Sequence, residues 1–319
     1  GVSLIDAVFP SGCHAVSQAA SLTLIDRARG AMLGLAIGDA LGATVEFMTP
    51  REIGQQYGVH DCIRGGGWLR LPAGEVTDDT TMTLALAGAW LSEGSAPSAN
   101  ACAEAFDRWM RAKPVDIGNT VRRGIVRWRL TGSTEAPLSS DAGNGATMRC
   151  LPVALATFGA ARERIEHAAH TQGRVTHHNP LTDAGTICVI DMVQAALDGR
   201  GMPGVMACMR RLVATHPAFD PAGWRCDNPS GYIVDTLRAV FQAFEAEDGF
   251  QRTLVDIVNR GGDADTTGAI GGMILGALCG ADALPPQWTQ GLRKTIREQC
   301  VASADALIEL SPGFAVIQR

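Results

Sequence analysis

Apolar residues recur with the period of an α-helix along most of the chain. In residues 29–45 they fall at Leu33, Ile37, Ala40 and Leu41, and a second stripe comprises Met82, Ala85, Leu86, Ala89 and Trp90. The same period predicts further helices at 98–112, 118–130, 150–157, 161–171, 183–197, 203–214, 230–247, 251–258 and 288–309. Long alternating runs of β-branched residues, which are typical of strands, do not occur. The pattern therefore predicts an all-α fold.

Segments rich in Gly, Pro and Asp separate these helices at 62–76, 131–146 and 219–229. No shift in composition marks a linker, so we predict a single domain over residues 23–319. Residues 1–22 are mildly apolar but lack the basic start of a signal peptide. We interpret them as an N-terminal extension, and a flexible tail, an expression remnant and a partner-binding arm all remain open.

Two of the predicted helical segments carry a glycine at every fourth position. The first has Gly30, Gly34, Gly38 and Gly42, and the second, near the other end of the chain, has Gly268, Gly272, Gly276 and Gly280. Glycine inside a helix costs about 1 kcal/mol relative to alanine, so this repetition requires a reason. Close approach of two helix backbones is one reason, and it would bring the segments that flank both helices together. Core packing alone is the alternative.

Charge and cysteine usage narrow the classes of function. The chain has 27 basic and 33 acidic residues, a net charge of −6 and no dense Lys/Arg run, which argues against a nucleic-acid binder. Its nine cysteines are odd in number and form no CxxC pair, so we expect reduced thiols in a cytoplasm rather than disulfides or a thiolate zinc site. The apolar segment 31–45 is too short to span a membrane and contains Asp39.

Two acidic clusters carry the strongest chemical signal. Thr77-Asp78-Asp79-Thr80 and Asp263-Ala264-Asp265-Thr266 each precede an apolar helical stretch. Thr and Asp are good helix N-caps, so capping explains either cluster alone. A cap needs only one such residue, however, and a second carboxylate adds repulsion that a cation would relieve. Carboxylate and hydroxyl oxygens suit Mg²⁺ or Mn²⁺ better than zinc. If the fold joins the clusters, we predict that they hold two divalent ions.

Four further positions have both a structural and a functional interpretation. Glu46 ends the first glycine-bearing helix and is either a solvated surface residue or part of a site. Asp116 precedes a predicted helix, where it could be a plain cap. Asn144-Gly145 is typical of a turn, but glycine backbone there could also cradle a phosphate. The pair His177-His178 could supply ligands, substrate donors or structural histidines.

Taken together, these stretches resemble the ADP-ribosylglycohydrolase family, and within it the dinitrogenase reductase-activating glycohydrolases. The matching segments are residues 34–47, 65–69, 76–80, 114–120, 143–149 and 261–268, in order over most of the chain. Two departures stand out: the segment His177-His178-Asn179-Pro180 replaces the His-Asn-His-Pro order of many relatives, and the extension before Asp26 is longer than usual.

The resemblance implies an all-α orthogonal bundle with a dinuclear Mn²⁺ or Mg²⁺ centre and ADP-ribosylarginine hydrolase activity. By position it implies the metal ligands Thr77, Asp78, Asp79, Asp263, Asp265 and Thr266. It implies Glu46 as an acidic residue beside the metals and Asp116 as the general acid/base. It also implies an ADP-ribose cleft lined by Gly118, Asn119, Asn144 and Gly145, with His177 and Tyr232 near the distal ribose and adenine.

The same resemblance suggests the nitrogenase iron protein as substrate and a PII-type nitrogen regulator as partner. Three other functions stay open. One is hydrolysis of serine-linked or O-acetyl-linked ADP-ribose by the same fold. Another is an immunity-type protein that binds and blocks an ADP-ribosyltransferase with residues 1–22. The third is a metal-stabilised helical scaffold without catalysis.

Overall fold

The computed structural model describes residues 11–246 and 249–319, with side chains described from residue 23 onward. Of the predicted extension, residues 1–10 lie outside the described residues. The first half of the chain forms α1 (Ser11–Val45), α2 (Pro50–Tyr57), α3 (Asp78–Glu93), α4 (Ala99–Arg111), α5 (Asn119–Thr131), α6 (Leu151–Ala156) and α7 (Arg162–Gly173). The second half forms α8 (Pro180–Leu197), α9 (Gly201–Thr215), η1 (Pro217–Phe219), α10 (Ile233–Glu245), α11 (Gly249–Asn259), α12 (Ala264–Cys279), η2 (Ala281–Ala283), α13 (Pro286–Gly291), α14 (Lys294–Glu309) and α15 (Pro312–Ile317).

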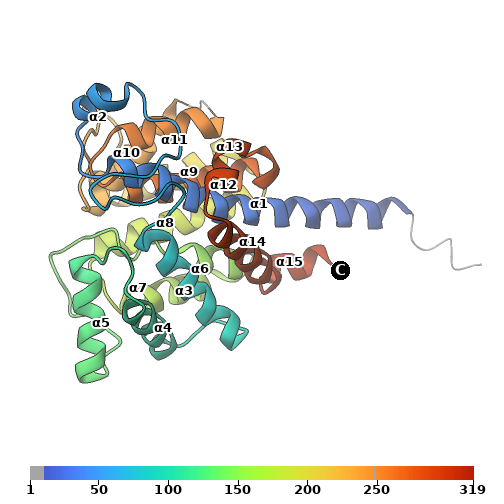
Figure 1. Cartoon of the computed structure of the whole chain (residues 1–319). Helices are drawn as coiled ribbons and strands as arrows, with labels where there is room; N and C mark the ends of the chain where they lie inside the picture. The colour runs from blue at the N-terminus through green and yellow to red at the C-terminus, as the bar shows by residue number, and fades with distance from the viewer. Residues whose placement is uncertain (1–10, 247–248) are drawn as a thin grey trace, which may run out of the picture.

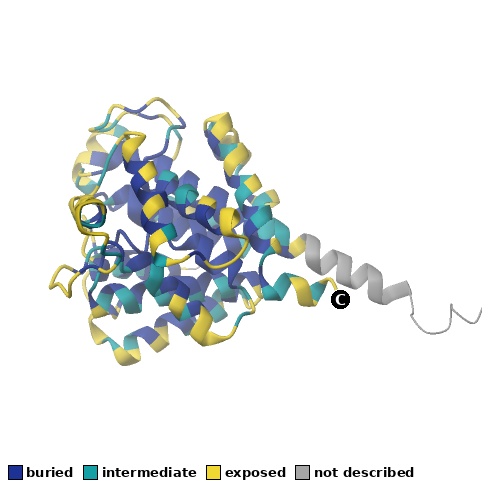
Figure 2. Ribbon diagram, turned by 90° about the horizontal axis from the view of Figure 1, so that it is seen from below, coloured by how far each residue is buried: buried dark blue, intermediate teal, exposed yellow. Residues whose placement is uncertain are grey.

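The predicted all-α orthogonal bundle is confirmed for the described residues. Figure 1 shows α1 running across the middle of the molecule beside α12, with α2, α10 and α11 drawn above and α3 to α7 below. Buried residues gather along this centre (Figure 2), where residues 264–277 of α12 are all buried. Within residues 11–246 and 249–319, β-type pairing is limited to two isolated bridges, Gly66 with Leu71 and Gly143 with Tyr232.

Helices α1 and α12 pack against each other through their glycines. A Cβ added at Gly34 would lie 2.1 Å from the Gly272 carbonyl oxygen, and one at Gly38 would lie 1.9 Å from that of Gly268. As residue numbers rise along α1, the numbers of the contacting α12 residues fall, so the two helices run antiparallel. The prediction of close backbone approach is therefore confirmed, and the start of α12 meets the end of α1.

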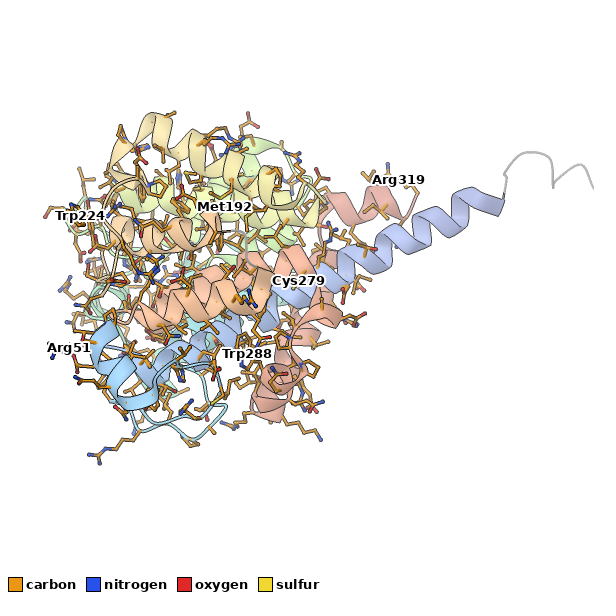
Figure 3. The ribbon with its side chains drawn as sticks, turned by 90° about the horizontal axis from the view of Figure 1, so that it is seen from above. Arg51, Met192, Trp224, Cys279, Trp288 and Arg319 are labelled. Atoms are coloured by element: carbon orange, nitrogen blue, oxygen red, sulfur yellow. The ribbon has the colours of Figure 1, made fainter. Side chains whose placement is uncertain are left out.

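The C-terminal helix predicted at 288–309 is wrong as a single element. Leu292 and Arg293 have extended backbones that separate α13 from α14. The amide of Arg293 donates instead to the Gly74 carbonyl (3.0 Å), because the 62–76 loop docks here. The indole N–H of Trp288, labelled in Figure 3, donates to the Asp61 carbonyl (2.9 Å) and fixes the same loop. The sequence pattern also missed the short helices α2 and α15.

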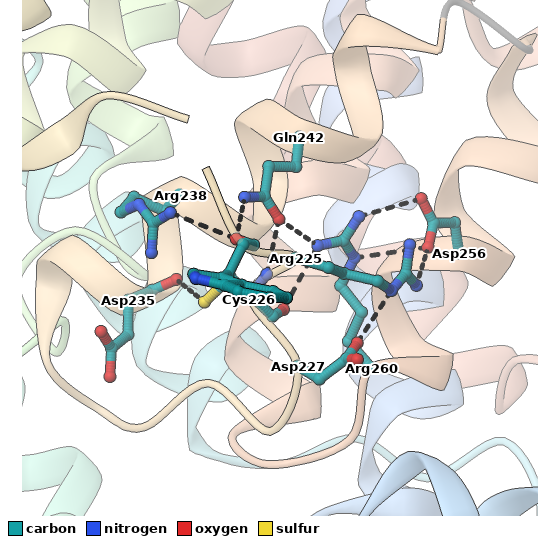
Figure 4. A network of polar contacts seen from close by, with 9 residues as sticks. Arg225, Cys226, Asp227, Asp235, Arg238, Gln242, Asp256 and Arg260 are labelled. Carbon is teal, nitrogen blue, oxygen red and sulfur yellow. Dashed lines mark hydrogen bonds and ion pairs between the residues drawn. The ribbon is translucent and has the colours of Figure 1, made fainter. Parts of the chain in front are cut away.

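A polar network fastens the 219–229 loop to α10 and α11 (Figure 4). The Arg225 guanidinium donates to Asp256 (2.6 Å) and to Asp227 (2.9 Å). Arg260, buried beneath the loop, donates to the Gln242 side chain (2.7 Å). The network holds the end of this loop, residues 228–231, at the mouth of the cavity described below.

In the part of the chain that the structure describes, no single helix combines the length and apolarity that crossing a membrane requires. The segment Thr23–Val45 meets that test only together with Pro50–Tyr57, across a bend of 87°.

Candidate metal centre and active-site pocket

The two acidic clusters meet at the start of α3 and α12. Thr77 is the N-cap of α3, and its hydroxyl accepts from the amide of Asp79. The same hydroxyl lies 3.0 Å from Asp79 Oδ2 and 3.2 Å from Asp265 Oδ2. The contact with Asp265 spans 188 positions of sequence. The prediction that the fold joins the clusters is confirmed.

Asp39, which the sequence prediction did not include, organises this junction from within α1. Its side chain is fully buried and accepts hydrogen bonds from the backbone amides of Thr77 and Thr80 (3.0 and 3.1 Å to Oδ2). It also accepts from the hydroxyls of Thr77 (2.8 Å) and Thr80 (2.6 Å). The available signal was a carboxylate inside an apolar, glycine-faced helix, which needs buried partners.

The carboxylates form two groups that could each hold a cation, and we call them the metal-side groups. Oxygens of Asp39, Asp79 and Asp265 lie within 4.8 Å of one another, and so do oxygens of Glu46, Asp263 and Asp265. Asp265 belongs to both groups. Thr266, the residue after Asp265, is buried as well. Asp78 does not belong to either group but faces the adjoining cavity.

A cavity of about 620 Å³ opens over these carboxylates. The predicted site residues that line it are Glu46, Asp78, Asp116, Gly118, Asn119, Asn144, Gly145, His177, Asp263, Asp265 and Thr266. Thr77 and Asp79 lie buried beneath its floor. Tyr232 does not line the cavity; it caps α10 and is 41% exposed. The structure thus brings all the predicted site residues except Tyr232 to one cavity or its floor.

Asp116 faces the metal-side carboxylates from the loop between α4 and α5. It is half-buried, and burial raises its pKa, with the nearby charge of Asp263 adding to the rise. The following helix begins at Asn119 with Gly118 as its N-cap, so no side chain caps its first amides. A carboxyl with a raised pKa is suited to hold and donate a proton near neutral pH.

The opposite wall of the cavity is held by Asn144. Its amide nitrogen donates to Asp263 (2.6 Å) and to the hydroxyl of Thr236 (3.0 Å), which ties this wall to α12 and α10. A Cβ at Gly145 would lie 2.8 Å from the His177 ring, so the backbone here lies directly against that ring.

His177 is neutral in this setting. Burial lowers its pKa to about 3, and the Arg149 charge contributes in the same direction. Its Nδ1 lies 2.7 Å from the Thr176 hydroxyl. The neighbouring His178 turns away, with Nδ1 2.8 Å from the Ala136 carbonyl. Only the first histidine of the pair therefore faces the cavity.

Two cavity-side aromatic residues were not singled out from the sequence. Phe47 follows Glu46 and lines the cavity. Trp68 lies in the glycine-rich 65–69 segment, and its indole N–H donates to Glu46 Oε1 (2.5 Å). Exposed aromatic residues give no periodic signal, so a sequence pattern could not separate them from core residues.

Comparison with known proteins accounts for this arrangement. The sequence profile described as ADP-ribosylglycohydrolase matches residues 20–313. The chain belongs to the ADP-ribosylglycohydrolase family. It is 47% identical to the ADP-ribosyl-[dinitrogen reductase] glycohydrolase of Rhodospirillum rubrum, over 90% of this chain and 97% of that protein. It is 35% identical to the ADP-ribosylarginine hydrolase Tri1 of Pseudomonas putida (strain GB-1), over 86% of this chain and 77% of that protein.

A solved structure extends the family likeness to three dimensions. The protein titled "ADP-ribosylglycohydrolase-related protein complex" superposes with a TM-score of 0.80 at 33% identity. The match covers 91% of this chain and 99% of the other. The fold of this glycohydrolase-family member therefore follows that of a solved relative over nearly its whole length.

The family implies divalent cations, and the donors of this chain fit them. Asp79 Oδ1 and Asp265 Oδ1 are buried without a hydrogen-bond partner. Oxygens of Glu46 and Asp265 lie within 4.8 Å of each other, and two carboxylates this close repel unless one is protonated or a cation lies between them. Hard carboxylate oxygens that lack protein donors are the ligands that Mg²⁺ and Mn²⁺ take in proteins.

Burial and crowding raise the pKa of these carboxyls. The pKa of Asp79 and of Asp265 lies well above its usual range, because each is buried and then because each faces other carboxylates. The pKa of Asp78 is also raised well above its usual range, first by burial and then by the charge of Asp116. Burial raises the pKa of Asp39 to about 6, although the Thr80 and Thr77 hydrogen bonds oppose it. Ionisation of these carboxyls as pH rises would therefore leave charge in the cluster that no cation among the described residues compensates.

This charge predicts a pH-dependent stability of the metal-free protein. A carboxyl whose pKa is raised on folding binds more protons when folded, so its stabilising contribution is present below the unfolded pKa and is lost as pH rises through the folded pKa. For Asp39, that loss falls between its usual pKa of 3.8 and its folded pKa of about 6. One pKa unit corresponds to about 1.4 kcal/mol, so Asp39 alone accounts for roughly 3 kcal/mol.

Added Mn²⁺ should offset this loss of stability at higher pH, because the cation compensates the ionised carboxylates. We expect the difference in Tm between Mn²⁺-loaded and metal-free protein to widen from about pH 5 to about pH 8, measured by differential scanning fluorimetry with and without EDTA. A difference that stays constant over this range would contradict the charge-crowding account.

Proposed function

We propose that this glycohydrolase removes ADP-ribose from a modified arginine side chain, with two Mn²⁺ or Mg²⁺ ions at the paired carboxylate groups. The observation that carries the proposal is the placement of Asp116 across one cavity from Asp263 and Asp265. That placement would let a proton donor and a set of metal-binding carboxylates act on the same part of a substrate. The arginine linkage is supported by the name of the Pseudomonas putida relative, an ADP-ribosylarginine hydrolase.

The reaction breaks the bond between ribose C1 and a guanidinium nitrogen. When bound, the ions would orient the ribose diol and lower the pKa of a water molecule. Burial raises the pKa of Asp116, which favours its role as the group that donates a proton to the leaving nitrogen. Glu46, oriented by the Trp68 indole, lies against Asp265 and is placed to take a proton from the attacking water.

The wall opposite Glu46 would bind the rest of ADP-ribose. Backbone amides at Gly118, Asn119 and Gly145 suit phosphate oxygens, since these residues line the cavity and the start of α5 carries no side-chain cap. Neutral His177 would face the distal ribose. Tyr232, at the rim rather than in the cavity, would cover the adenine only when substrate is present.

The proposed target is the iron protein of nitrogenase, since the Rhodospirillum rubrum relative is named for dinitrogen reductase. A PII-type regulator remains a proposed partner, and a cytoplasmic location remains the expectation from cysteine usage.

Replacing Asp116 with asparagine should reduce ADP-ribose release by at least about 100-fold, because general acid catalysis contributes about 10²–10⁴ in rate. Mn²⁺ binding should persist, since Asp116 belongs to neither metal-side group. Release from an arginine-ADP-ribosylated protein is measured by chromatography, and Mn²⁺ binding by calorimetry. The exposed Asp61→Asn serves as the matched control and should retain full activity. Near-normal turnover by Asp116→Asn would remove Asp116 from the mechanism.

A further inference from the structure

Two aromatic rings beside Glu46 remain open to solvent, and one of them, Phe47, lines the cavity. Phe47 is 65% exposed and Trp68 is 50% exposed. Their ring centroids are 5.3 Å apart, with an angle of 52° between the planes. Large apolar side chains normally lose such exposure on folding, and an exposed aromatic pair beside a cavity marks a contact surface for a ligand.

The backbone fixes both rings in these exposed positions. Phe47 has a left-handed φ of 66°, which a bulky residue rarely adopts, and its amide donates to the Gly262 carbonyl (2.8 Å). Gly67 also has positive φ, and a Cβ there would lie 2.5 Å from the Ala43 carbonyl oxygen. The Thr44 hydroxyl donates to the Gly65 carbonyl (2.8 Å). The segment that carries Trp68 is therefore docked on the end of α1.

The surroundings of the pair select a cation. Phe47 directly follows Glu46, which belongs with Asp263 to one of the metal-side groups. Trp68 donates to the Glu46 carboxylate, so its indole lies directly beside the acidic groups. A planar guanidinium stacks on aromatic faces and pairs with carboxylates, whereas a phosphate would be repelled here. The cavity-lining groups that suit phosphate are instead the backbone amides of Gly118 and Gly145.

We propose that Phe47 and Trp68 form the subsite for the leaving group, holding the guanidinium and side chain of the modified arginine against their ring faces. This inference rests on the proposed function and adds how the site would recognise the arginine leaving group. Because the Trp68 indole also binds Glu46, the residue that contacts the leaving group positions a carboxylate beside the scissile bond.

The test uses the Mn²⁺-loaded full chain and ADP-ribosyl-agmatine, a small arginine-like substrate that makes no protein–protein contact. Phe47→Leu keeps an apolar side chain and removes the ring, and Trp68→Phe keeps a ring and removes the N–H to Glu46. We expect Phe47→Leu to raise KM about threefold to tenfold with little change in kcat, the size of one partly exposed cation–π contact. We expect Trp68→Phe to lower kcat, because Glu46 loses its donor.

Two further measurements make the result specific. The affinity for free ADP-ribose, measured by calorimetry, should change less than about twofold in Phe47→Leu. Trp224→Ala, which removes an aromatic side chain that is 93% exposed and does not line the cavity (Figure 3), should leave KM unchanged. An unchanged KM in Phe47→Leu, or an equal loss of ADP-ribose affinity, would overturn the inference. Absence of hydrolysis by the unaltered protein would instead refute the proposed function itself.

Discussion

Replacing Asp265 with asparagine should abolish metal-dependent activity while making the metal-free protein more stable. Asp265 is the carboxylate shared by both metal-side groups, so its loss weakens two cation sites at once. Removing a residue that only orients a metal ligand typically costs about 10–100-fold, and we expect the loss of this shared ligand to exceed about 100-fold in activity. Asparagine cannot ionise, so it removes the repulsion between this carboxylate and Asp79, which raises the pKa of Asp265.

The opposite signs of the two effects make this variant diagnostic. Activity and Mn²⁺ affinity are measured with the loaded protein, and Tm is measured in EDTA at about pH 8. Glu93→Gln, an exposed change at the end of α3, is the matched control and should alter neither. If Asp265→Asn bound Mn²⁺ with unchanged stoichiometry, or if its metal-free Tm fell, Asp265 would not be the central ligand.

Replacing Gly38 with alanine should prevent stable folding. The added Cβ would lie 1.9 Å from the Gly268 carbonyl oxygen and 2.3 Å from its carbon, so two helix backbones must separate. Overpacking against side chains costs about 1–3 kcal/mol, and backbone cannot yield as side chains do, so we expect a loss above about 3 kcal/mol. The separation would also move Asp39, the next residue, away from Thr77 and Thr80.

Gly88 provides the control for this change. It lies inside α3, and a Cβ there meets no atom within 4 Å. Gly88→Ala should therefore stabilise the protein by about 0.5–1 kcal/mol, since alanine is the better helix former. Chemical denaturation of both variants separates local propensity from interhelical contact. A Gly38→Ala protein as stable as the unaltered chain would show that the helices do not need this glycine contact.

The glycine spacing explains why so much of this fold could be predicted. A four-residue glycine repeat on two distant helices favours close backbone packing over core packing alone only once the structure is known, and this packing is what brings the acidic clusters at Thr77 and Asp263 together as predicted. The helical period also predicted most elements. The helical period could not predict a helix break that a tertiary contact causes. The break at Arg293 is an example, because its amide donates to the Gly74 carbonyl.

The residues missed at the site share a physical reason. Asp39 acts through four hydrogen bonds to a helix that begins nearly forty positions later, and such partners leave no mark on the local pattern. Phe47 and Trp68 resemble core aromatics in sequence, and only the structure leaves their rings exposed. Tyr232, expected near the adenine, is the N-cap residue of α10 and does not line the cavity, and its role at the substrate stays a prediction.

The central claim is that paired carboxylates hold divalent ions for the removal of ADP-ribose from arginine. The most direct measurement incubates the protein with arginine-ADP-ribosylated target and, in parallel, serine-ADP-ribosylated target, each with Mn²⁺ or with EDTA, and quantifies free ADP-ribose. We predict release from the arginine-linked target with Mn²⁺ and none in EDTA. Equal release in EDTA, or release from the serine-linked target alone, would contradict the account.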